Sequence, residues 1–210
     1  MLKLKFVKIL AFFVALAGLL VAIGWIFDIG FLRNIPPSAV PMKFTTAVCF
    51  VAGSIVLYSA THERSESSFT AQTILPSAIL LILLVMVTLL VSSIFGFHSD
   101  LDIFLVQEKV GADTLTYGRA AIPSMINSIL IAIAGILFFA GFKKHFLWLG
   151  TVMTLIGGAA ILGHIISQPF LYFPVSISGI STGMALLSAI LFILVGIGFI
   201  LCGNTASKQN

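Results

Sequence analysis

The chain carries PMKFTTAVCFVAGSIVLY at residues 41–58 and, much later, GMALLSAILFILVGIGFI at residues 183–200. Both stretches place Met, a small hydroxyl residue, Ala and Phe at the same spacing, and the Gly that follows is offset by one residue. A hydroxyl in the first turn can cap free N–H groups or bond a neighbouring helix, while Ala and Gly let backbones approach closely. We therefore predict that each stretch starts a helix with one closely packed face. The helix-start signature comprises Met42, Thr46, Ala47, Phe50, Met184, Ser188, Ala189 and Phe192.

A looser copy of the signature lies between these two, in RAAIPSMINSILIAIAGILFF at residues 119–139. Its nearest counterparts are Asn127, Ser128 and Gly135. Each copy follows an apolar segment and a connector, which is the pattern of a repeated helical hairpin. We expect one domain over residues 1–203, built from three related hairpins at about 6–60, 73–141 and 146–203, with a short polar tail at 204–210.

The composition is that of a membrane protein. Hydrophobic residues make up 60% of the 210 residues and charged residues only 9%, against about 25% charged in a soluble domain. Because lipid leaves no partner for open backbone groups, long apolar segments without strand alternation are expected to be helices. We predict an all-α integral membrane protein with six transmembrane helices, at about 6–27, 44–60, 73–96, 120–141, 146–166 and 184–203.

The charge distribution predicts the orientation. Lys and Arg exceed Asp and Glu on the side that holds both termini and the short connectors THERSESS and GFKKH, whereas the other side is slightly acidic. The positive-inside bias then places both termini in the cytoplasm, in a multi-pass protein of the cell's inner (plasma) membrane. The first apolar run is about 20 residues, longer than the 7–15 of a signal peptide, so we expect an uncleaved first span. Scattered basic residues argue against a nucleic-acid partner and leave membrane lipid as the expected contact.

Three outer residues are candidates for ligand binding. His164 lies near the end of the fifth apolar segment, and an ionisable residue in a membrane segment is a functional candidate by default. A neutral His that bonds a carbonyl group explains it equally well. Tyr172 and Phe173 belong to the uncharged connector that follows, which we expect to lie along the membrane interface.

The second outer connector offers a weaker polar site. His98, Asp100 and Asp102 form an H-x-D-x-D run that resembles a set of metal ligands. Without a fourth partner the run indicates solvated loop residues more than a metal site, so no metal is predicted. Asp102 and Arg119 are also candidate ligand-binding residues, and their pairing would brace this connector.

The sequence contains no arrangement typical of catalysis. It has no nucleophile–base constellation, no paired carboxylates within the apolar segments and no phosphate-binding glycine loop. We predict a protein that is not an enzyme and needs no cofactor. No Asp, Glu, Lys or Arg lies at the centre of an apolar segment, which weighs against a transporter.

Several of these motifs resemble a known family. They are Gly-Trp-Ile-Phe-Asp-Ile at 24–29 followed by PMKFTTAVCFVAG, FGFHSDLDIFLVQE at 95–108 followed by Gly118-Arg119, and PFLYF at 169–173 followed by GMALLSAILF. They are similar to the N-terminal multi-pass membrane sensor regions of prokaryotic histidine kinases and diguanylate cyclases. In this resemblance Asp102 and Arg119 match the Asp and Arg of the second outer loop. Leu187 stands where that family often has His, and Thr45 where it often has Asn.

The resemblance implies a sensor-like function. No kinase or cyclase domain follows the last apolar segment, so a sensing module would require a separate signalling output protein. We expect a stand-alone, non-catalytic membrane sensor-like module that detects a small apolar ligand or a state of the membrane. The alternatives are an accessory subunit of a larger membrane protein complex, held by the same small-residue faces, and a small transporter.

Overall fold

A computed structural model describes residues 2–33, 40–62, 70–96, 120–172 and 183–206. Every element in this part of the chain is a helix. In chain order the elements are α1 (Leu2–Ile26), α2 (Gly30–Arg33), α3 (Phe44–Ala60), the π-helical turn η1 (Thr70–Ile74), α4 (Leu75–Phe95), α6 (Ile122–Phe139), the 3₁₀ turn η2 (Lys143–His145), α7 (Phe146–Ile165), α8 (Pro169–Tyr172) and α9 (Leu186–Ala206).

Each of the six expected apolar segments coincides with one long helix. Five helical stretches are long and apolar enough to cross a membrane: Leu2–Ile26, Gln72–Phe95, Ile122–Phe139, Lys143–Ile165 and Leu186–Thr205. The sixth apolar helix, Phe44–Ala60, has 17 residues and is shorter. At 1.5 Å per residue it extends about 25 Å, a little less than the roughly 30 Å hydrocarbon core of a bilayer.

The helix boundaries differ from the expected ones in places. α1 begins at Leu2 and so includes the first three lysines, whose long side chains can extend to the membrane surface. α9 begins at Leu186, two residues after the expected start, and continues to Ala206 in the expected polar tail. Pro169 opens the short helix α8, because proline suits the first position of a helix, where no N–H bond is lost.

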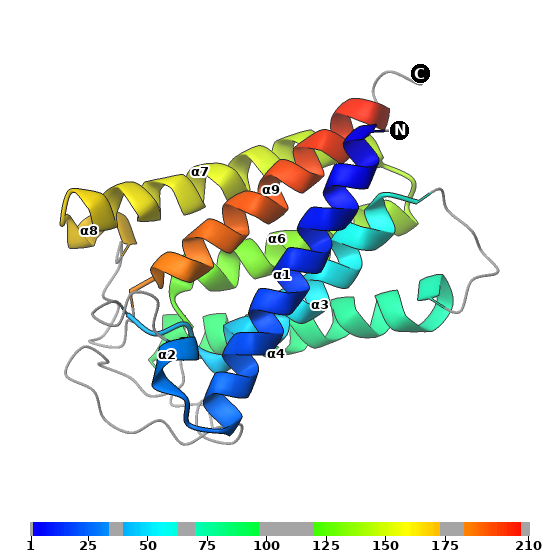
Figure 1. Cartoon of the computed structure of the whole chain (residues 1–210). Coiled ribbons are helices and arrows are strands. Elements are labelled where there is room, and N and C mark those ends of the chain that lie inside the picture. The colour runs from blue at the N-terminus through cyan, green and yellow to red at the C-terminus, as the bar shows by residue number, and fades with distance from the viewer. Residues whose placement is uncertain (1, 34–39, 63–69, 97–119, 173–182, 207–210) are drawn as a thin grey trace.

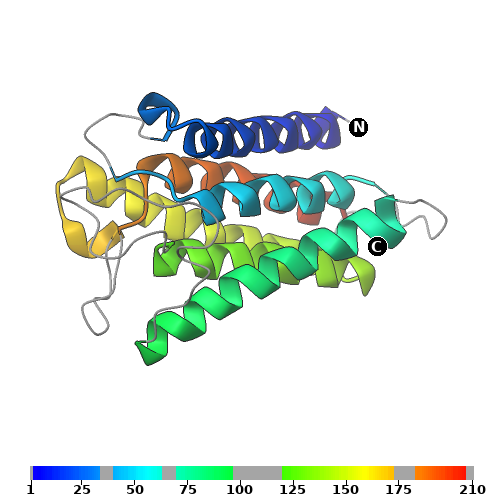
Figure 2. The same cartoon turned by 90° about the horizontal axis from the view of Figure 1, so that it is seen from below.

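The long helices form one bundle with the chain termini at one end (Figure 1). Consecutive long helices pack against each other as α1 with α3, α4 with α6, and α7 with α9, and α3 also contacts α4 and α6. The short helices α2 and α8 lie at the end of the bundle opposite the termini, as the second view confirms (Figure 2). The bundle therefore has a terminal end and an opposite end, and the polar sites described below occupy both.

The helix-start signature forms the centre of the bundle. All eight of its residues are at most 2% exposed. The Phe50 and Phe192 rings lie 4.5 Å apart between centroids, so α3 and α9 meet through matching positions. A Cβ atom on Gly18 of α1 would lie 2.8 Å from the carbonyl oxygen of Ala47, and one on Gly157 of α7 would lie 2.8 Å from that of Ala189. Glycine thus lets each preceding helix approach the signature alanine.

The middle signature has a different register from the expected one. α6 begins at Ile122, and Ser124 occupies the position relative to the helix start that Thr46 has in α3 and Ser188 has in α9. Ser124 is 2% exposed, like these two hydroxyl residues. By position relative to the helix start, Ser124 matches Thr46 and Ser188, whereas the expected counterparts Asn127 and Ser128 lie about one turn further into α6.

Candidate functional site

His164 joins three helical elements at the end of the bundle opposite the termini. Its Nε2 atom lies 2.8 Å from the carbonyl oxygen of Met184, which precedes α9. Its ring stacks on that of Tyr172 in α8, with centroids 4.1 Å apart and planes 11° apart. The backbone N–H of Met184 donates to the carbonyl oxygen of Tyr172 at 2.8 Å. We call His164, Tyr172 and Met184 the histidine junction.

The protonation of the imidazole follows from its partner. A carbonyl oxygen can only accept a hydrogen bond, so Nε2 of His164 must carry a proton and donate it. Within the described residues no hydrogen bond involves Nδ1 of this half-buried ring. Nδ1 is therefore the atom that can take up a second proton or bind a ligand without breaking the bond to Met184.

A tight turn after α7 brings Tyr172 to the histidine. Ser167 adopts a left-handed conformation with φ of 52°, and the N–H of Gln168 bonds the carbonyl oxygen of Gly163 at 2.9 Å. A Cβ atom on Gly163 would lie 2.6 Å from Cβ of Leu171 and 3.0 Å from a ring carbon of Tyr172. Only glycine permits this approach, so Gly163 sets the position of α8 and hence the ring stack.

The same turn occurs after α1. Asp28 is left-handed with φ of 55°, and the N–H of Ile29 bonds the carbonyl oxygen of Gly24 at 2.8 Å. A Cβ atom on Gly24 would lie 2.7 Å from Cβ of Leu32 in α2. The turn before α2 and the turn before α8 are thus equivalent bond by bond.

Trp25 occupies the place in the first turn that His164 has in the second. Its Nε1–H donates to the carbonyl oxygen of Met42 at 2.8 Å, and the N–H of Met42 bonds the carbonyl oxygen of Arg33. The Arg33 guanidinium lies 4.8 Å from the Trp25 ring centroid and pairs with Asp28 at 2.6 Å. Trp25 is only 6% exposed, so its ring lies inside the bundle.

The tryptophan junction after α1 and the histidine junction after α7 differ in the chemistry of the ring that closes them. The tryptophan junction is closed by an indole, which does not titrate, and by an ion pair. The histidine junction is closed by an imidazole, whose second ring nitrogen can accept a hydrogen bond or bind a ligand. Sequence inspection named His164 and Tyr172 but did not predict their contact with Met184. The sequence did contain a signal for this contact. A Gly-Trp pair and a Gly-His pair each precede a short helix and then a Met of the helix-start signature.

The remaining predicted site residues lie outside the described part of the chain. These are Phe173, the Asp102–Arg119 pair and the His98, Asp100 and Asp102 run. Within the described residues no group of three His, Cys, Asp or Glu side chains is placed to hold a metal ion.

A second polar cluster, which the sequence did not predict, lies at the terminal end. The Nζ atom of Lys8 lies 3.1 Å from Nε2 of His62 and 5.5 Å from the Tyr58 ring centroid. Lys143 donates from Nζ to the carbonyl oxygen of His62 at 2.6 Å. In the sequence these residues are separate charges in an N-terminal segment and two connectors, so only the fold brings them together.

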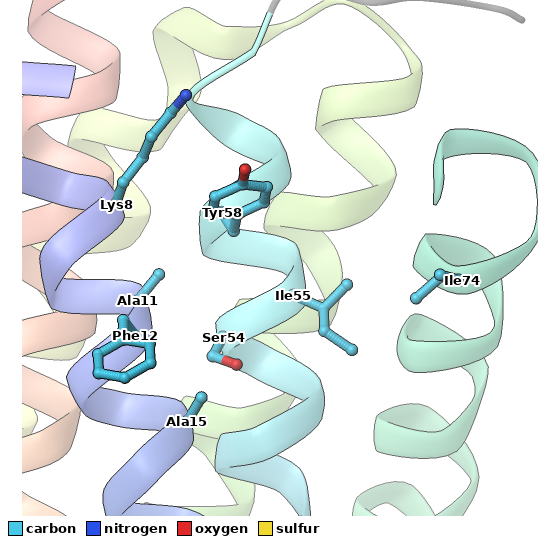
Figure 3. Close-up of a pocket in the computed structure, with 8 residues that line it drawn as sticks. All are labelled: Lys8, Ala11, Phe12, Ala15, Ser54, Ile55, Tyr58 and Ile74. Carbon is cyan, nitrogen blue, oxygen red and sulfur yellow. The ribbon is translucent and has the colours of Figure 1, made fainter. Parts of the chain in front are cut away.

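Lys8 of this basic cluster lines one end of a groove (Figure 3). The groove has a volume of about 460 Å³ and is open along one side. Helix α1 forms one wall, α3 the floor, and the residue before α4 the other wall. The lining residues are Lys8, Ala11, Phe12, Ala15, Ser54, Ile55, Tyr58 and Ile74.

Two polar side chains remain without a hydrogen-bond partner among the described residues. They are the hydroxyl of Thr45 in α3 and the whole amide group of Asn127 in α6. Asn127 is fully buried. A buried polar group without a partner costs about 1–3 kcal/mol, so each lowers the stability of the bundle.

Comparisons with known proteins give no assignment. No protein-family model matches the chain, and neither a curated protein nor a solved structure is significantly similar to it.

Proposed function

We propose that this chain is a stand-alone, non-catalytic membrane sensor-like module that acts through a separate protein partner. The observation that carries the proposal is the histidine junction. Its Nδ1 atom, which bonds none of the described residues, offers a protonation or ligand-binding point, and its other contacts connect α7, α8 and the start of α9. A stimulus at this ring would change contacts among three elements at once.

Close packing provides a route from the junction to the terminal end. Gly157 and Gly196 let the α7 and α9 backbones approach to contact distance along the pair. Such a pair resists independent bending and shifts as a unit, which is how small changes at one site become helix movements elsewhere. A partner that binds at the terminal end would detect this shift.

The proposed topology has six spans in three related hairpins with both termini in the cytoplasm of the plasma membrane. The equivalent turns before α2 and α8 support a repeat, as does the matched approach of Gly18 to Ala47 and Gly157 to Ala189. The excess of lysine near the termini supports the orientation. Phe173, Asp102 and Arg119 remain proposed contributors to an outer ligand site, in keeping with the resemblance to sensor regions.

Capture of the partner from native membranes tests this function. The full chain would be purified under mild detergent as the wild type and as His164→Gln, which keeps an N–H donor but cannot titrate. His145→Gln is the matched control, since His145 is exposed at the terminal end. We expect capture of a signalling output protein whose activity responds to wild type and His145→Gln but not to His164→Gln.

The alternative has a distinct outcome in the same experiment. An accessory subunit would be recovered in a fixed stoichiometric complex with a membrane enzyme whose activity is unchanged by His164→Gln. That result would overturn the sensing proposal.

A further inference from the structure

Three separate segments bring two lysines and a histidine to the terminal end of the bundle. Lys8 comes from α1, His62 follows α3, and Lys143 opens η2. Both lysine Nζ atoms lie against His62, one at its ring and one at its backbone carbonyl. The two ammonium groups therefore converge on one residue.

The contacts of Lys8 leave its charge available for a ligand. Within the described residues its ammonium group contacts the His62 and Tyr58 rings and no carboxylate. The other ring nitrogen of His62 lies 3.1 Å from the carbonyl oxygen of Tyr58. Because a carbonyl accepts and an ammonium donates, a neutral ring with its proton on Nδ1 satisfies both contacts. Lys8 therefore supplies positive charge at the groove, and its contact with the His62 ring positions it.

The groove beside Lys8 is apolar along its length. Below Lys8 and Tyr58 it is walled by small and hydrophobic side chains of α1 and by Ile74 on the other side (Figure 3). From Lys8 to Ala15 it follows α1 for two helical turns, about 10 Å. Its volume of about 460 Å³ is in the range of small-molecule sites, about 300–1,000 Å³.

We propose that this groove binds one acyl chain of an anionic phospholipid, whose phosphate is held by Lys8 and Lys143. An apolar groove that opens sideways from a membrane bundle meets lipid chains, and basic pockets at the ends of transmembrane helices attract anionic headgroups. The Tyr58 side chain lies at the same end of the groove as Lys8 (Figure 3). A choline headgroup would bring a further positive charge towards the two lysines, so an anionic lipid is preferred. The site does not depend on the sensing proposal or on the orientation of the chain.

Native mass spectrometry of the full chain in detergent tests the headgroup contacts with phosphatidylglycerol and phosphatidylcholine as probes. We expect Lys8→Gln and Lys143→Gln each to weaken phosphatidylglycerol binding about fivefold. Lys5→Gln and Lys144→Gln remove the same charge from exposed positions at the same end and should change it less than twofold. Equal losses in all four variants, or no loss in any, would overturn the proposal.

A second pair of variants tests the chain-binding groove. Ala15→Phe fills the groove and should lower phosphatidylglycerol binding more than fivefold, whereas Leu16→Phe, on the neighbouring exposed position, should not. Glycerophosphoglycerol, which has the headgroup without the chains, should not displace the lipid at millimolar concentration. If glycerophosphoglycerol displaced the lipid, the site would bind phosphate without the acyl chain. If the wild type carried a second protein chain and no lipid, the groove would be a protein-docking surface. Either result contradicts the proposal. Circular dichroism confirms that each variant is folded.

Discussion

At the scale of single residues, His164 has a structural role that can be separated from any sensing role. Its N–H donates to the carbonyl oxygen of Met184, which accepts no other hydrogen bond from the described residues, and its ring packs flat on Tyr172. Loss of both contacts leaves the Met184 carbonyl oxygen without this donor, in a residue that is fully buried. Leaving such a group unpaired costs about 1–3 kcal/mol.

This cost gives the first prediction. His164→Leu should lower the free energy of unfolding by about 1–3 kcal/mol, while His164→Gln, which keeps an N–H donor, should lose clearly less. Denaturant titration of the full chain in mixed micelles, followed by circular dichroism, measures both. Equal destabilisation by the two variants would show that ring stacking, not the hydrogen bond, holds the junction.

At the scale of elements, the α7–α9 pair depends on glycine at the contact. A Cβ atom on Gly157 would lie 2.8 Å from the Ala189 carbonyl oxygen, a backbone atom that cannot rotate away. Gly158, the next residue, has nothing within 4 Å of the same position and so serves as a matched control. Alanine at either position raises helix propensity equally, but only alanine at Gly157 meets a neighbouring helix, so the two variants distinguish packing from helix propensity.

The predicted change in bundle stability has opposite signs for alanine at Gly157 and at Gly158. Gly157→Ala should destabilise the bundle by about 1–3 kcal/mol through overpacking. Gly158→Ala should be neutral or stabilise it by up to about 1 kcal/mol, because alanine favours the helix. Thermal unfolding midpoints of the two variants in the same detergent measure the difference. A fall in both midpoints would mean that α7 tolerates no side chain on either face.

The elements also show what the sequence could and could not predict. Apolar length predicted α3 to the residue, since lipid and the bundle core both demand an uninterrupted apolar helix. The turn after α7 was missed because it depends on a left-handed Ser167, a conformation that serine rarely adopts and that no local pattern indicates. His164 and Tyr172 were recognisable by type, but their contact required that turn. The basic cluster was unpredictable for the same reason, because it joins three distant segments.

At the scale of the whole molecule, the two ends of the bundle differ in chemistry. The terminal end gathers Lys8, His62 and Lys143, and Lys8 also lines an apolar groove. The opposite end carries the tryptophan and histidine junctions, where ring N–H groups bond backbone carbonyls. A membrane with cytoplasmic anionic lipid would bind the terminal end more favourably, in agreement with the positive-inside bias.

The orientation is testable with reporters at the C-terminus. The terminal end concentrates Lys3, Lys5, Lys8, Lys143 and Lys144, and retention of such charges in the cytoplasm is the physical basis of the bias. An alkaline phosphatase fused after Lys208 should therefore be inactive, and a green fluorescent protein at the same site should fluoresce. The same two reporters fused after Gly96, at the opposite end of α4, should give the reverse result. Strong phosphatase activity after Lys208 would instead place the termini outside and move the basic groove to the outer leaflet.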